Sequence, residues 1–218
     1  NTIAPFEHAV NAIGVELTQN EFDALVSLAY NIGIGDYTLY NNVDGYKNIA
    51  IGHQALYTNT TGTYNVAIGS TAMYNSIGTQ YNTAIGYQSL YTNTTGDVNV
   101  GIGINTLYAN STGINNIAVG YAALITNTYG IGNIALGAYQ VGFRLAALHY
   151  NTTGSYNIAI GLGGLGNNTT GTYNTAVGTS TLSASTYGGF NTAIGYATLN
   201  QNTTGSYNTA IGSYTMQY

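Results

Sequence analysis

Side chains that could perform acid–base or nucleophilic chemistry are few and widely spaced in this sequence. No pair of carboxylates follows Asp44, and the serine and threonine hydroxyls have no ordered histidine or aspartate partner. The three histidines, His8, His53 and His149, stand at unrelated positions. A metal site needs several converging ligands, and catalysis needs a nucleophile or an acid held beside its base. We therefore expect no catalytic residue, no metal site and no cofactor.

The scarcity of charge excludes several classes of partner. Only 4% of the 218 residues are charged, whereas an ordinary soluble domain carries about 25%. Two cations, Lys47 and Arg144, cannot form the basic face of a nucleic-acid-binding protein. No apolar run reaches the roughly 18 residues of a membrane span. Neither nucleic acid nor a membrane span is expected. Beyond residue 47, the only charges are Asp97 and Arg144.

An internal repeat supplies the elements that must position any functional group. The string YNTAIG recurs, and its final glycine anchors eleven units. Nine of the ten spacings between anchors are 17 residues, and the remaining one is 24. The anchor glycines are Gly35, Gly52, Gly69, Gly86, Gly103, Gly120, Gly137, Gly161, Gly178, Gly195 and Gly212.

Several columns of the repeat are nearly constant. Alanine or glycine stands two residues before the anchor, an aliphatic residue one before it, and leucine, methionine or Val141 four after it. A glycine within Asn-Thr-Thr-Gly lies seven residues before the next anchor. Asparagine stands four residues before every anchor, at Asn31, Asn48, Asn65, Asn82, Asn99, Asn116, Asn133, Asn157, Asn174, Asn191 and Asn208.

These columns predict an all-β fold, a parallel β-solenoid or β-roll of 17-residue coils. The unit is too short for helix-pair repeats, and its Asn, Thr, Gly and Ile disfavour helix. Each unit is typical of a short strand, a glycine corner and a turn. Identical strands stack roughly 4.8 Å apart, so ten steps give a rod of about 50 Å. We expect the constant asparagines to form a ladder of side-chain amides.

The two faces of the strand differ in composition. Alternate side chains point to opposite faces, so the isoleucine and the preceding Thr, Val or Ile share one face, and alanine and asparagine share the other. We expect one face to fill the coil and the other to meet a neighbouring chain. Each coil is expected to bury about one Ile, one Leu and one Ala, which is little for a lone rod.

The strings YNTAIGYQSLYTNTTG (81–96) and NTTGSYNTAIG (202–212) resemble the repeats of bacteriophage and bacterial tail-fibre-type proteins. More loosely, their strand core resembles the heads of trimeric autotransporter adhesins. The likeness covers residues 31–218. It implies a left-handed, homotrimeric roll in a virion or on an extracellular surface. Its expected partners are further copies of the chain, other virion or fibre proteins and a host surface glycan.

Residues 1–34 have a different character. Thr18 and Glu21 fit a capping box, and the apolar spacing that follows predicts a helix near 19–31. The string FEHAVNAIGVELTQNEFDALVSLAYNIGIG (6–35) resembles the phage-type lysozyme (endolysin) family beyond its catalytic region, so no catalytic residue is carried over. We interpret 1–34 as a helical cap or linker, left by recombination, and 35–218 as the solenoid shaft. Without an initiator methionine, the chain is expected to be an internal or processed segment.

Three features admit a functional interpretation beside a structural one. The seven-residue excess around 138–150, which contains Phe143, Arg144, Leu145 and His149, is interpreted as a tolerated bulge rather than a contact loop. The Asn-x-Ser/Thr sequons are interpreted as turn chemistry rather than glycosylation sites. They lie at Asn59, Asn93, Asn110, Asn151, Asn167, Asn168 and Asn202.

Two tyrosine columns favour coil-on-coil stacking over sugar binding. They contain Tyr40, Tyr57, Tyr74, Tyr91 and Tyr108, and Tyr30, Tyr64, Tyr81, Tyr156, Tyr173 and Tyr207. The expected function is a structural or adhesive fibre shaft without catalysis. The alternatives are a glycan- or ice-binding solenoid surface and part of a cell-wall hydrolase. The threonine before Ala-Ile-Gly occurs only at Thr83, Thr175, Thr192 and Thr209, an irregular column that disfavours ice.

Overall fold

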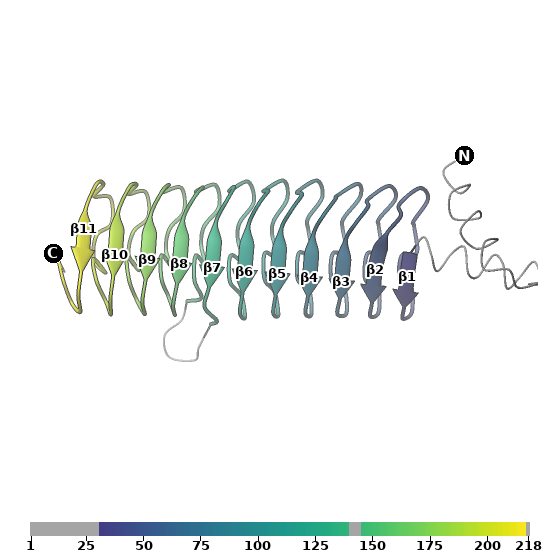
Figure 1. Ribbon diagram of the computed structural model, residues 1–218, viewed down its shortest axis with the longest axis horizontal. Helices are drawn as coiled ribbons and strands as arrows, with labels where there is room; N and C mark the ends of the chain where they lie inside the picture. Colours follow the sequence, from purple (N-terminus) through teal and green to yellow (C-terminus); the bar gives the residue numbers. More distant parts are fainter. Residues whose placement is uncertain (1–30, 140–144, 217–218) are drawn as a thin grey trace, which may run out of the picture.

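The computed structural model describes residues 31–139 and 145–216, which form one solenoid of parallel coils (Figure 1). No helix occurs within these ranges. The eleven strands are β1 (Asn31–Ile34), β2 (Asn48–Ile51), β3 (Val66–Ile68), β4 (Thr83–Ile85), β5 (Val100–Ile102), β6 (Ile117–Val119), β7 (Ile134–Leu136), β8 (Ile158–Ile160), β9 (Thr175–Val177), β10 (Thr192–Ile194) and β11 (Thr209–Ile211).

The strands form a single parallel sheet in sequence order, so each pairs only with the strands before and after it. The register matches equivalent residues: Ala67 lies opposite Ala84, and Ile68 lies opposite Ile85. Backbone hydrogen bonds continue beyond the strand, as between the Leu56 N–H and the Ala72 carbonyl at 3.0 Å. The predicted β-solenoid of 17-residue coils is therefore confirmed. Its handedness and trimeric state stay predictions.

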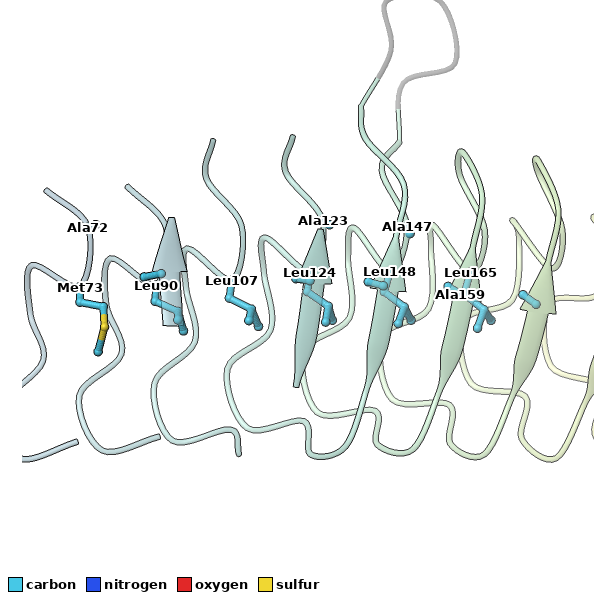
Figure 2. Close-up of a cluster of buried hydrophobic side chains, with 14 of the residues drawn as sticks. Ala72, Met73, Leu90, Leu107, Ala123, Leu124, Ala147, Leu148, Ala159 and Leu165 are labelled. Atoms are coloured by element: carbon cyan, nitrogen blue, oxygen red, sulfur yellow. The ribbon is translucent and has the colours of Figure 1, made fainter. Parts of the chain in front are cut away.

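The core is narrow and is filled by three columns of side chains, one of which is the small residue three positions after the anchor, such as Ala72 or Ala123. The strand alanine, which β1 and β5 replace with glycine, and the leucine or methionine that follows the corner are fully buried through the middle of the rod (Figure 2). The strand isoleucines are not buried, and Ile85 and Ile102 are 37% and 38% exposed. The expectation that each coil buries its isoleucine is wrong, because alanine and asparagine occupy the inner face of the strand.

The longest unit keeps its register around the extra residues. Tyr139 still donates to the Tyr121 carbonyl, and Ala147 donates to the Gly137 carbonyl as the equivalent alanines do elsewhere. Residues 140–146 are therefore the additional ones. Buried Leu148 takes the leucine position of this unit, which corrects the assignment of Val141 to that column.

The end of this segment packs on the next coil. A Cβ placed on Gly166 would come within 2.7 Å of the Leu145 side chain, so this glycine leaves room for Leu145. Val141, Phe143 and Arg144 lie outside the described residues. The predicted helix near 19–31 and its capping box also lie outside them, except for Asn31, which begins β1.

The anchor glycines are required by close approach and by backbone conformation. At Gly161, φ is 128°, and an added Cβ would lie 2.6 Å from the carbonyl oxygen of Gly178, the next anchor. The Gly161 N–H also donates to the Leu136 carbonyl at 2.8 Å. Ten of the eleven anchors share a φ between 117° and 138°, a region that favours glycine. The corner therefore brings successive coils into backbone contact.

Three other positions of the coil hold non-glycine residues in the left-handed backbone region. In one coil they are Tyr81, Gln88 and Leu90, with φ of 58°, 53° and 53°. Each such residue costs about 1 kcal/mol, and conformations of this kind persist where the surroundings fix them. Here the fixing contacts are inter-coil hydrogen bonds such as that from the Leu90 N–H to Thr106.

The anchor requirement can be tested with two glycines of one coil. We expect Gly161→Ala to lower the free energy of unfolding by about 3 kcal/mol or more, because the new methyl group meets the Gly178 backbone. Gly163→Ala is the matched control. Its column already holds Ala122 and Ala197 at φ of 60° and 50°, and no atom lies closer than 3.8 Å to its Cβ position. Equal losses in thermal unfolding would contradict the contact argument.

Candidate functional site: ladders and outward columns

The asparagines four residues before the anchors form a continuous ladder along the inside of the coil. Oδ1 of Asn99 accepts the backbone N–H of Asn116 at 3.0 Å and its Nδ2 at 3.2 Å. Nδ2 of Asn116 also donates to the Gly130 carbonyl at 2.8 Å. The backbone bond recurs at all ten steps, between 2.9 and 3.0 Å.

The structure thus brings all eleven predicted ladder residues together. The side-chain bond recurs at every step except that from Asn99, whose Nδ2 keeps only its bond to the Gly113 carbonyl. Asn48 to Asn191 of this ladder are at most 1% exposed. Because each inner amide is buried and each Oδ1 already accepts from the next coil, neither a hydrophobic residue nor a carboxylate can replace it without loss.

A second asparagine ladder, missed in the sequence, lies seven residues after the anchors. Nδ2 of Asn110 donates to Oδ1 of Asn93 at 2.7 Å and to the Gly113 carbonyl at 3.0 Å. The sequence signal is the asparagine that fills eight of these ten positions, and the same residue also suits a turn. The asparagines are Asn42, Asn59, Asn93, Asn110, Asn127, Asn151, Asn168 and Asn202.

This second ladder changes the status of the sequons. Five of the seven sequon asparagines are fully buried, and their amides bond within the ladder or to the turn glycine: Asn59, Asn93, Asn110, Asn151 and Asn168. A glycan could not be attached to these five in the folded chain, which agrees with the structural interpretation. Asn167 and Asn202 are half-exposed.

Two serines interrupt the second ladder. Ser76 and Ser185 stand where the other coils have asparagine, and Oδ1 of the preceding Asn59 and Asn168 is buried without a partner. At the first break Thr79 replaces the turn glycine. A Cβ on the equivalent Gly62 would collide with Oδ1 of Asn59. The smaller Ser76 therefore makes room for the Thr79 side chain.

Both tyrosine columns stack along the rod. Tyr57 and Tyr74 have ring centroids 5.0 Å apart and planes 1° apart, and Tyr156 and Tyr173 are 5.0 Å and 14° apart. Phe190 continues the latter column at 4.9 Å from Tyr173. Coil-on-coil stacking is the geometry expected from the sequence. The first column ends at Tyr108, and His149 occupies the same position two coils later.

Among the described residues, no two like charges occupy the same repeat position in adjacent coils. Asp97 lies between Gln80 and Ile114 in its column, and its Oδ1 accepts the Gln80 N–H at 2.7 Å. Lys47 Nζ donates to the Tyr64 hydroxyl at 2.9 Å, which raises the pKa of Lys47. Burial lowers the pKa of His149, whose ring meets Tyr150 edge-on at 4.7 Å.

No group of three potential metal ligands occurs among residues 31–139 and 145–216. No helix in these ranges is long and apolar enough to cross a membrane. Of the irregular threonine column, Thr83, Thr175 and Thr192 are half-buried and Thr209 is exposed.

A pair of adjacent asparagines tests the first ladder. Asn116→Asp should cost at least about 3 kcal/mol at pH 7, because a buried carboxylate would face the Gly130 carbonyl and Oδ1 of Asn99. Burial raises the pKa of such a carboxyl above its unfolded value of about 4, so the loss should shrink as the pH falls through the raised pKa and should be smallest below about pH 4. Exposed Asn115→Asp is the control and should change little. Equal thermal stability of both variants at pH 7 would refute the ladder.

The breaks in the second ladder allow a repair. Ser185→Asn places an Nδ2 beside the unpartnered Oδ1 of Asn168, and the turn residue of this coil is already a glycine, Gly188. The substitution should therefore stabilise the chain by about 1 kcal/mol. Ser76→Asn alone should destabilise it, because Thr79 occupies the space; Thr79→Gly should rescue that variant. Chemical denaturation measures the stability of all three variants. A stabilising Ser76→Asn single variant would contradict the packing argument.

Comparison with known proteins places one part of the chain. A family model described as phage lysozyme matches residues 1–49. No curated protein and no solved structure matches the chain. The matched residues overlap the solenoid from β1 to the start of β2. The chain therefore combines a lysozyme-like N-terminal segment with a repeat β-solenoid.

Proposed function

We propose that the chain is a non-catalytic structural or adhesive shaft of a phage tail fibre or a similar surface appendage. The observation that carries this proposal is the sequential, in-register sheet of eleven strands. Each coil adds about 4.8 Å of length and contacts its neighbours through the same residues. A rod built this way can act as a spacer of defined length, because each added unit lengthens it without changing its cross-section.

Stiffness follows from the contacts between coils. Backbone hydrogen bonds, two asparagine ladders and stacked tyrosines join successive coils at several points around the circumference. Bending would stretch these contacts on one side of the rod. The shaft would hold a receptor-binding tip or a lytic module away from a particle or cell, in a virion or on an extracellular surface.

The outward face of the sheet supports association of several copies. None of the eleven aliphatic residues before the anchors is buried, and those at Ile85, Ile102, Ile160 and Ile194 are 37–39% exposed. They form an uncharged apolar strip along the whole rod. Parallel sheets are normally covered on both faces. The apolar strips of three identical chains can pack against one another around a three-fold axis. The proposed partners are therefore two further copies of the chain, in a homotrimer.

The lysozyme-like segment is proposed to serve as a cap or linker. The family match ends at residue 49, and the family's catalytic residues, which the resemblance places before this stretch, have no counterpart here. Other virion or fibre proteins would join the shaft at its ends. A host surface glycan is the remaining proposed partner.

Native mass tests the trimer. We expect about three times 22.8 kDa by analytical ultracentrifugation. The double variant Ile102→Lys and Ile160→Lys should reduce the mass to one or two chains while the circular dichroism spectrum is retained. The control is the double variant Tyr129→Lys and Tyr187→Lys, which should stay trimeric. These two tyrosines lie away from the strands and are 59% and 65% exposed. A wild-type monomer would contradict the proposed assembly.

A further inference from the structure

A shallow groove lies on the turn side of the rod, away from the strands. Its volume is about 460 Å³, and it crosses four consecutive coils from Thr126 to Thr186. The lining residues stand mainly six and eight positions after the anchors. These positions flank the second ladder, whose asparagines point inward, so both flanking side chains face outward. No charged residue lines the groove.

Tyr150 forms one wall of this groove. It is 45% exposed, and its neighbours at the same repeat position, in the coils before and after it, are Thr126 and Asn167. It therefore has no aromatic stacking partner in the adjacent coils, unlike the stacked residues of the two tyrosine columns. Its ring contacts that of His149 edge-on, with the ring centroids 4.7 Å apart. Its position leaves ring surface for a ligand.

The threonine hydroxyls of the groove, and one N–H of the Asn167 amide, already donate to backbone carbonyls. The hydroxyls of Thr152, Thr169 and Thr186 each donate to a carbonyl of the next coil at 3.0 to 3.1 Å. Thr126 donates to the His149 carbonyl at 2.7 Å, and the Asn167 amide donates to the Ser183 carbonyl at 2.7 Å. The threonine oxygens therefore remain as a row of acceptors at the spacing of the coils, beside the Tyr150 hydroxyl and the second N–H of Asn167.

We propose that this groove binds a neutral oligosaccharide lying along the rod, with a sugar ring against Tyr150 and its hydroxyls donating to the threonine and asparagine oxygens. A polyhydroxyl chain supplies the many donors that such acceptors need, and its C–H face suits an aromatic ring. An extended peptide fits less well, because the neighbouring backbone groups are already bonded between coils and cannot add a strand.

The site is independent of the apolar strip, which lies one residue before the anchors and about half a coil away in sequence. Binding in the groove and assembly through the strip can therefore fail separately. The full chain is titrated calorimetrically with maltohexaose, cellohexaose, xylohexaose and chitohexaose. At least one should bind, with a Kd of about 1 mM or below. Hexagalacturonate, which is anionic, should not bind.

Variants assign binding to the groove. Tyr150→Ala should raise Kd at least tenfold, and Tyr150→Phe should keep most of the affinity because the ring remains. Tyr129→Ala, a 59% exposed tyrosine outside the groove, should bind like the original chain. Asn167→Leu should also weaken binding, since it removes an acceptor. Circular dichroism verifies that each variant keeps the rod.

Three outcomes would overturn the proposal. They are no binding by any neutral hexasaccharide, equal affinity of Tyr150→Ala and the original chain, and equal binding of the anionic hexamer. Thermal hysteresis without saccharide binding would assign the threonine rows to ice and would overturn it too. In each case the native mass still reports separately on the shaft.

Discussion

Every side chain in this solenoid faces its own equivalent one coil away, and the buried asparagine amide is the group that satisfies this condition best. One amide both donates and accepts, so an identical copy can bond above and below without limit. Asn116 does so through Asn99 and Asn133, and also ties the strand to the turn at Gly130. Coil spacing, register and the inward orientation of the strand all follow from this repeated contact.

The same condition explains the near-absence of charge. A carboxylate or ammonium in a constant column would meet its own charge roughly every 4.8 Å along the rod. Asp97 is tolerated because Gln80 and Ile114 flank it. Lys47 is tolerated because it ends a tyrosine stack, with its ammonium over the Tyr64 ring at 4.7 Å. Neutral columns are therefore a structural requirement of the stack and need no reference to a partner.

Self-similarity made most of the fold predictable. The period, the strand, the glycine corner and the asparagine ladder could each be inferred from columns, because a repeat forces equivalent residues together. The choice of inner face could not. Alternation separates Ala84 from Ile85 but does not say which is inside. The leucine column decides it: a Cβ on Gly101, at the alanine position, would already lie 3.6 Å from Leu90 and 2.6 Å from Ser89, so only small residues fit there.

The irregular unit and the second ladder were harder to foresee. Counting from Gly137 placed Val141 in the core, whereas the extra residues precede the leucine position and Leu148 occupies it. Asn110 sits in a sequence that also suits a turn, and burial alone separates the two roles. The groove beside Tyr150 depends on side chains from several coils, which no single unit reveals. Self-similarity thus identifies shared contacts well and exceptions poorly.

The central claim is that buried asparagine amides form a continuous hydrogen-bonded ladder, and hydrogen exchange of side-chain amide protons measured by NMR tests it most directly. The exposed amide of Asn115 should exchange at the rate of a free asparagine, whereas that of its neighbour Asn116, which donates to Asn99 and Gly130, should be strongly protected. Protection should be similar from Asn65 to Asn174 and weaker at Asn31 and Asn208, which are less buried. Equal exchange of the Asn115 and Asn116 amides would contradict the account.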